Sequence, residues 1–179
     1  MKKSLILSGF AGIGKTTLQQ KYPNIIDLES SDFKWIYSDQ SLEETDKEKR
    51  KGTTQRTQNP LWPLNYVKAI VEASITHDIV LISQDLDMRN CLKENGIEYS
   101  VCFPTKDCKE EFIQRYRNRG NNEAFISLVN SNFETWIDAL DKEQNKILIQ
   151  KGEYLEDTLL RYELISNPLI ISDNLGKTK

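Results

Sequence analysis

The chain of 179 residues has few of the side chains that hold structural metals or form disulfides, with one histidine and three cysteines. Cys91, Cys102 and Cys108 are odd in number and form no Cys-x-x-Cys pair, so neither a disulfide scaffold nor a structural zinc site is expected. His77 cannot build a histidine cluster alone, and its place at the end of an apolar helical pattern suggests a capping or surface residue. We therefore expect a reducing, cytoplasmic compartment.

Long apolar runs and a strong excess of one charge are also missing. The apolar runs, such as residues 79–82, are of strand length, so none can span a bilayer, and the short apolar stretch after Met1 is too brief for a signal peptide. Lys and Arg number 24 and Asp and Glu 27, a net charge of -3, which argues against a protein that coats nucleic acid. We expect a monomer or homodimer whose partner is a small-molecule acceptor.

Apolar patterning predicts strands that alternate with helices. Strands are expected at 3–8, 24–29, 78–83, 97–103 and 146–150, and helices at 15–22, 63–75, 85–96, 105–119, 125–140 (with a break near 131–132 left open) and 155–164. This alternation predicts an α/β fold, a five-stranded parallel sheet with helices on both faces, in one domain over residues 1–179. The segment from Ser38 to Thr57 holds one large aliphatic residue, Leu42, and should be an exposed excursion. The apolar residues after Ser166 could pair at a sheet edge.

Residues 9–16 carry the strongest motif. They read Gly-Phe-Ala-Gly-Ile-Gly-Lys-Thr and fit Gly-x4-Gly-Lys-Ser/Thr, a P-loop or Walker A match whose chance probability is on the order of 1%. The glycines let successive backbone amides point at one anion, and the following helix adds its positive end. Lys15 would reach the β- and γ-phosphates of a nucleotide and the Thr16 hydroxyl would hold Mg²⁺. The expected nucleotide contacts are Gly9, Gly12, Ile13, Gly14, Lys15, Thr16 and Thr17.

The chain resembles the nucleoside-monophosphate-kinase-like group of P-loop kinases, which includes adenylate, thymidylate, shikimate and gluconate kinases. It is most similar to small phage-type and bacterial nucleotide kinases with Asp-x-Glu-Ser-Ser after the second strand, here residues 27–31, and an Arg-Tyr-x-x-Arg-Gly lid, here 115–120. The resemblance covers residues 3–165. It implies a P-loop NTPase fold with a flap at about 33–60 and a lid at about 105–123, and the use of ATP and Mg²⁺.

The end of the second strand faces the acceptor in such kinases. Period-two geometry places Asp27 and Glu29 on one side of the strand, where they could reach a Mg²⁺-bound water or an acceptor hydroxyl. The alternative is that they are capping or turn residues. Candidate acceptor contacts are Glu29, Asp32, Lys34, Trp35 and Arg89, although an aromatic residue is more often core. Arg50 and Arg56 in the flap could clamp a phosphate or could belong to a solvated face.

The third strand ends at Ser83, where a standard second nucleotide motif has Asp. The metal ligand beyond Thr16 is therefore open between Asp85, Asp27 and a water, with Asp85 as the candidate. Arg89 follows Asp85 by four residues, so the two could form an ion pair on a helix. In adenylate kinases an arginine at this place grips the acceptor phosphate.

Glu111, Arg115 and Arg119 recur every four residues on one polar helix face. Phosphoryl transfer needs cations that neutralise the moving group, so the arginines could act as lid donors, with Lys15 and Asp27 as the other catalytic candidates. The alternative is a surface helix with a Glu111–Arg115 ion pair. By position, Gly152 would lie in the loop that touches the nucleotide base.

These patterns predict an ATP-dependent kinase that moves the γ-phosphoryl to a small acceptor, with a nucleoside or deoxynucleoside monophosphate as the first choice. A kinase of a hydroxyl acceptor, such as a DNA end, a modified nucleoside or a small metabolite, is the second reading. In it Asp27 would act as the base. A nucleotide-binding regulatory module without turnover is the third, because the acid after the third strand is missing.

Overall fold

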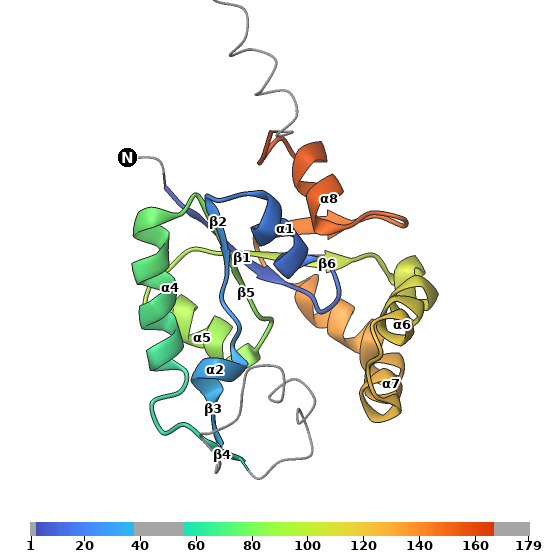
Figure 1. Ribbon diagram of the computed structural model, residues 1–179, viewed down its shortest axis with the longest axis horizontal. Helices are drawn as coiled ribbons and strands as arrows, with labels where there is room; N and C mark the ends of the chain where they lie inside the picture. Colours follow the sequence, from blue (N-terminus) through green and yellow to red (C-terminus); the bar gives the residue numbers. More distant parts are fainter. Residues whose placement is uncertain (1–2, 38–55, 167–179) are drawn as a thin grey trace, which may run out of the picture.

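A parallel sheet of five strands forms the centre of the computed structural model, which describes residues 3–37 and 56–166 (Figure 1). Its strands are β1 (Leu5–Gly9), β2 (Ile25–Asp27), β5 (Ile79–Ile82), β6 (Ser100–Pro104) and β7 (Lys146–Ile149). Their order is β2-β5-β1-β6-β7, and every neighbouring pair is parallel. The predicted α/β fold with a five-stranded parallel sheet is confirmed, and β1, which leads into the phosphate loop, is its central strand.

Helices follow the strands as the alternation predicted. They are α1 (Lys15–Lys21), α2 (Ser31–Lys34), α4 (Leu64–Thr76), α5 (Leu86–Glu94), a short 3₁₀ turn (Lys106–Cys108), α6 (Lys109–Asn118), α7 (Glu123–Leu140) and α8 (Leu155–Arg161). Helix α1 packs on α8, α4 packs on α5, and α6 packs on α7. No helix in the described part of the chain is long and apolar enough to cross a membrane.

Local signals explain most helix boundaries. Pro63 directly precedes α4, and the Asp85 side chain accepts hydrogen bonds from the Asp87 and Met88 amides at the start of α5. Asn122 caps α7 through the Phe125 amide, 2.8 Å away. Helix α7 runs unbroken to Leu140, so the break left open near 131–132 is absent.

A second, two-stranded sheet lies in the predicted flap range. It pairs β3 (Trp35–Tyr37) with β4 (Arg56–Gln58) in antiparallel register. The sequence analysis missed both strands, because three-residue strands give no readable alternation and depend on each other for hydrogen bonds. The remainder of the predicted excursion, including Arg50, and the apolar tail from residue 167 lie outside the described residues.

Tyr66 of α4 ties together the ends of two strands that carry site residues. Its side chain is fully buried, its hydroxyl donates to the Leu28 carbonyl (2.6 Å), and the Ser83 amide donates to that hydroxyl (3.3 Å). Burial raises the Tyr66 pKa well above its ordinary value, so the hydroxyl stays a donor. The carboxyl ends of β2 and β5 are thus held beside the phosphate loop, where ligands bind in open α/β sheets.

Candidate active site

The phosphate loop is held in a curled conformation by its neighbours. Gly12 and Gly14 have φ angles of 77° and 97°, in the left-handed region that residues with side chains rarely adopt. The Phe10 amide donates to the Cys102 carbonyl of β6 (2.9 Å), and the Leu155 amide of α8 donates to the Ile13 carbonyl (2.8 Å). These two hydrogen bonds fix the loop at Phe10 and at Ile13, and the curled backbone between them forms a cradle for an anion before any ligand binds.

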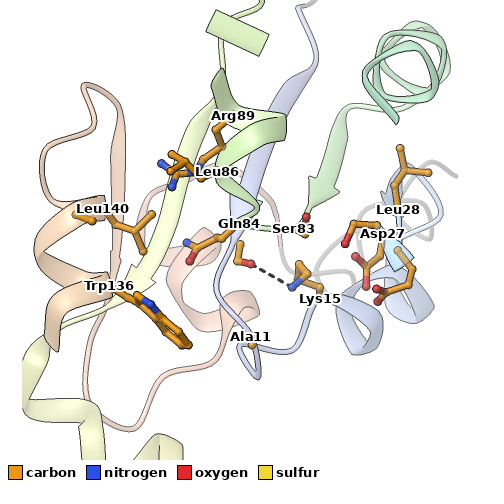
Figure 2. A pocket seen from close by; sticks show the side chains of 14 residues that line it. Ala11, Lys15, Asp27, Leu28, Ser83, Gln84, Leu86, Arg89, Trp136 and Leu140 are labelled. Carbon is orange, nitrogen blue, oxygen red and sulfur yellow. Dashed lines mark hydrogen bonds between the residues drawn. The ribbon is translucent and has the colours of Figure 1, made fainter. Parts of the chain in front are cut away.

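Lys15 lies inside this cradle. Its ammonium donates to the Gly9 and Phe10 carbonyls at 3.2 and 3.3 Å. The dashed line in Figure 2 marks the bond to Gly9. Removal from water lowers the Lys15 pKa, the Asp27 and Glu29 carboxylates oppose that shift, and the like charge of Arg119 adds to it. A phosphate group in the loop would raise the Lys15 pKa again, because it supplies an opposite charge beside the buried ammonium.

Thr16 and Asp27 form a pair of hard oxygen ligands beside Lys15. The Thr16 hydroxyl donates to Asp27 Oδ2 (2.9 Å), and the Asp27 amide donates to the Gln19 side chain. Burial raises the Asp27 pKa, while Lys15 and the Thr16 hydrogen bond act against the shift. A Mg²⁺ ion prefers such oxygen ligands. The donor set therefore fits the predicted metal role of Thr16, with Asp27, one of the alternatives from the sequence, as the acid beside it.

Asp85, the metal ligand that the sequence favoured, has protein partners for both carboxylate oxygens. One carboxylate oxygen caps α5 and the other pairs with the Lys34 ammonium. The same ammonium lies 5.0 Å from the centre of the Trp62 ring. Lys34 and Asp85 thus join α2 to α5, and neither lines the cavity described next. The role of Asp85 as metal ligand stays a prediction, with Asp27 as the alternative that lies beside Thr16.

A cavity of about 540 Å³ opens directly beside Lys15. Figure 2 shows Asp27 and Leu28 on one side of it, Trp136 and Leu140 on the other, and Ser83 and Gln84 between them. Its lining comprises Gly9, Ala11, Lys15, Asp27, Leu28, Glu29, Ser30, Ser83, Gln84, Leu86, Arg89, Trp136, Ala139 and Leu140. The cavity thus joins the phosphate loop to the carboxyl ends of β2 and β5 and to helices α5 and α7.

Of the predicted acceptor contacts, the structure brings Glu29 and Arg89 to this cavity. The Glu29 side chain is exposed and accepts a hydrogen bond from the Ser31 amide (3.3 Å). Asp32 lies exposed on α2, and Trp35 lies under the Arg56 guanidinium, 4.1 Å from its ring centre. Neither Asp32 nor Trp35 lines the cavity, so their contact with an acceptor stays a prediction.

Arg89 is buried, with 6% of its surface exposed, and pairs with the Glu143 carboxylate. The Lys93 ammonium (2.9 Å) and the Tyr99 hydroxyl (3.1 Å) bind the same carboxylate. Burial alone would raise the Glu143 pKa, but the Lys93 hydrogen bond and the Arg89 charge outweigh it and lower the pKa. The ion pair with Asp85 that the spacing allowed is therefore wrong: Arg89 faces a carboxylate 54 residues away.

The two candidate lid arginines have different surroundings. Arg115 is buried, pairs with Glu111, donates to the Glu153 carbonyl (2.6 Å) and lies 3.9 Å from the Tyr154 ring centre. It therefore takes the ion pair that the sequence offered as the alternative. Arg119 is exposed at the end of α6, close enough to Lys15 to lower the lysine's pKa. Of the two, Arg119 is the one whose charge acts on Lys15, and the catalytic role of both arginines stays a prediction.

The loop at residues 150–154 is braced by charged groups. Gly152, whose φ is 83°, donates its amide to Glu111 Oε2 at 2.9 Å. Glu153 accepts from Arg161 at 2.7 and 2.8 Å and from the Gln150 amide at 3.0 Å. The Arg161 bonds are the largest cause that lowers the Glu153 pKa, to about 2. The predicted base-contacting loop is thus rigid before any nucleotide arrives.

The sequence analysis missed two aromatic contributors. Tyr116, in the helix predicted at 105–119, donates its hydroxyl to the Ala11 carbonyl of the phosphate loop (2.8 Å). Trp136, in the helix predicted at 125–140, lines the cavity. Helical spacing shows only that both rings face inward, and no feature of it distinguishes a core contact from a site contact.

No family model matches the chain, and no curated protein matches it. Among solved structures, the chain is similar to a gluconokinase from Sinorhizobium meliloti 1021 with 15% identity and a TM-score of 0.49, over 89% of this chain and 88% of that chain. The fold rests on the sheet order and the phosphate loop described above.

Proposed function

We propose that the protein is an ATP-dependent phosphotransferase that moves the γ-phosphoryl group to a small acceptor bound in the cavity. The observation that carries the proposal is the position of that cavity: Lys15 lies at its wall, and α5 and α7 build the side away from the phosphate loop. Nucleotide binding or hydrolysis requires the loop alone. A separate, partly enclosed chamber beside the lysine is what a second substrate requires.

Each residue near Lys15 has a role in this reaction. The loop amides and the Lys15 ammonium bind the phosphate chain and stabilise the charge of the transferring group. Thr16 and Asp27 would hold Mg²⁺, which supplies charge neutralisation between the phosphates. Arg119, at the end of α6, supplies a second positive charge that stabilises the transferring phosphoryl group. Arg115 positions the loop at 150–154 and does not act on the phosphoryl group.

The described part of the cavity favours a hydroxyl acceptor over a monophosphate. Arg89 is already paired with Glu143, which also binds Lys93, whereas the Asp27 and Glu29 carboxylates lie near Lys15 and are open to an acceptor hydroxyl. An acceptor hydroxyl oxygen would bond to the γ-phosphorus as the bond to the ADP oxygen breaks, and its proton would pass to a carboxylate. Because Asp27 already binds Thr16, Glu29 is the better base, although the sequence favoured Asp27.

Two alternative functions each have support in one observation. A nucleoside monophosphate, the first choice from sequence, has support in the Arg89 guanidinium at the cavity wall. A nucleotide-binding module without turnover has support in Ser83, which stands where an acid is standard. The module would bind ATP and transfer its phosphoryl group to no acceptor.

Transfer of labelled phosphate from ATP to a panel of small alcohols and monophosphates, with Mg²⁺ present, tests the proposal. Product should form, Lys15→Met should abolish it, and Glu29→Gln should lower kcat by at least about 100-fold with ATP affinity unchanged. Glu123→Gln, at the exposed start of α7, is the control. Tight ATP binding without transfer to any acceptor would instead support the regulatory module.

A further inference from the structure

Two peptide units of the phosphate loop are held from outside by hydrogen bonds to their carbonyls. The Leu155 amide donates to the Ile13 carbonyl, and the Tyr116 hydroxyl donates to the Ala11 carbonyl, both at 2.8 Å. The first donor is a backbone group, which every residue except proline would supply at position 155. The second is a side chain of α6, so the hold on Ala11 depends on which residue stands at position 116.

The Tyr116 side chain is fixed by its surroundings. It is fully buried, and its ring contacts Phe112 and Phe125 edge to face, with centroids 6.2 and 5.2 Å apart. The ring also packs closely on Gly12, where an added Cβ would lie 2.7 Å from Tyr116 Cε1. Burial raises the Tyr116 pKa well above its ordinary value, so the hydroxyl stays protonated and remains a donor.

The bond to the Ala11 carbonyl determines where the next amide points. The Ala11–Gly12 peptide is trans, so its carbonyl oxygen and its N–H lie on opposite sides of a rigid plane. Because the oxygen is turned toward Tyr116, the Gly12 N–H points away from α6. This amide has no hydrogen-bond acceptor among residues 3–37 and 56–166. It is therefore a donor that is free to bind an anion in the loop.

We propose that Tyr116 is a positioning residue for the nucleotide: its hydroxyl holds the Ala11–Gly12 peptide so that the Gly12 amide donates to the phosphate chain. Without the hydroxyl, the Ala11 carbonyl has no partner on α6 and the peptide plane can rotate. Gly12 permits that rotation because it has no Cβ. The amide then loses its direction, and a transferring phosphoryl group is stabilised by donors that are oriented in advance. The inference rests on nucleotide binding at the loop, which the proposed function includes.

Glycine amide signals in NMR spectra test the direction of this donor. Ala11–Gly12 is the one Ala-Gly pair in the sequence, so labelling with ¹³C-carbonyl alanine and ¹⁵N-glycine assigns the Gly12 signal. Mg²⁺ with a non-hydrolysable ATP analogue should move this signal downfield in the wild type, because a proton donated to a phosphate oxygen is deshielded. Tyr116→Phe keeps the ring and should lose most of the shift. Gly96, whose amide donates to the Lys93 carbonyl (3.0 Å), reports on the fold and should not move.

Kinetics separate positioning from a general loss of structure. Tyr116→Phe should lower kcat/KM for ATP by at least about 10-fold in phosphate transfer, and leave KM for the best acceptor of the panel nearly unchanged. Tyr22→Phe is the matched control. Tyr22 is also buried, its hydroxyl donates to Glu156 Oε1 of α8 (3.1 Å), and neither residue lines the cavity. This control should keep both the Gly12 shift and kcat/KM.

The outcomes distinguish the two proposals. An equal Gly12 shift and equal kcat/KM in the wild type and Tyr116→Phe would overturn the positioning role and leave the phosphotransferase in place. The same follows if Gly12 stays still in the wild type while other loop glycines move, or if Tyr22→Phe loses as much as Tyr116→Phe. A wild type in which no glycine signal moves and no phosphate is transferred would overturn the proposed function, and the inference with it.

Discussion

Replacing Gly12 by alanine tests the packing of α6 on the phosphate loop. An added Cβ would lie 2.7 Å from Tyr116 Cε1, and the residue has a φ of +77°. The left-handed conformation costs about 1–2 kcal/mol for a residue with a side chain. Insertion of a methyl group into a packed contact costs about 1–3 kcal/mol more. We therefore expect Gly12→Ala to lower the free energy of unfolding by about 2–5 kcal/mol.

Gly96 supplies the matched control for this prediction. Its φ is +66°, and an added Cβ there would meet nothing within 4 Å. Gly96→Ala should therefore show the backbone cost alone, about 1–2 kcal/mol. Urea denaturation of both variants without nucleotide gives the difference between them, which isolates the contact with Tyr116. Equal destabilisation of the two variants, within about 0.5 kcal/mol, would refute the reasoning.

A double-mutant cycle then assigns the contact to the ring. Tyr116→Ala removes both the ring and the hydroxyl that donates to the Ala11 carbonyl. Gly12→Ala should cost less in that background, by a coupling energy within about 0.5–3 kcal/mol. Tyr116→Phe keeps the ring, so it should give no such relief. Additive behaviour in Tyr116→Ala would show that the strain lies in the backbone alone.

Three further predictions concern the charged groups. Thr16→Val removes the donor to Asp27 and should weaken Mg²⁺-dependent ATP binding by about 10–100-fold in calorimetry, whereas unchanged Mg²⁺ dependence would exclude the metal role. The Glu153 pKa is about 2, below its ordinary 4.5, so its contribution to stability is full above pH 4.5 and is lost as the pH falls towards 2. Glu153→Gln should flatten urea midpoints over that range, and a curve parallel to the wild type would contradict this. Arg115→Met should lower the free energy of unfolding by about 3 kcal/mol and leave kcat little changed. Arg119→Met should lower kcat by about 100-fold or more and leave the free energy of unfolding nearly unchanged. The reverse pattern would identify Arg115 as the lid donor.

The phosphate loop and the main sheet could be predicted because their signals are local. The glycine and lysine spacing of residues 9–16 requires no distant partner, and buried parallel strands read as short apolar runs. Strands β3 and β4 carry no such signal. Their pairing joins separate segments, Trp35–Tyr37 and Arg56–Gln58, and three apolar residues in β3 and three polar residues in β4 are too few to reveal it.

The tertiary structure, in contrast, decided which charged side chains pair with one another. Sequence spacing paired Arg89 with Asp85, but the fold brings Glu143 to Arg89 and Lys34 to Asp85. The hydrogen bond between Thr16 and Asp27 likewise depends on α1 lying beside the end of β2. A charged side chain pairs with the opposite charge that the backbone places within reach, and distance along the chain does not determine that.

The amino-acid sequence by itself predicted a phosphate-binding loop after β1 and determined the parallel sheet that supports this loop. Only the folded chain decided what lies on the other side of Lys15, because the cavity there is built from β2, β5, α5 and α7, which are far apart in the sequence. Trp136 shows the physical reason. The same apolar spacing buries one ring in the core and leaves another at a cavity wall, and the choice depends on how the neighbouring helices pack.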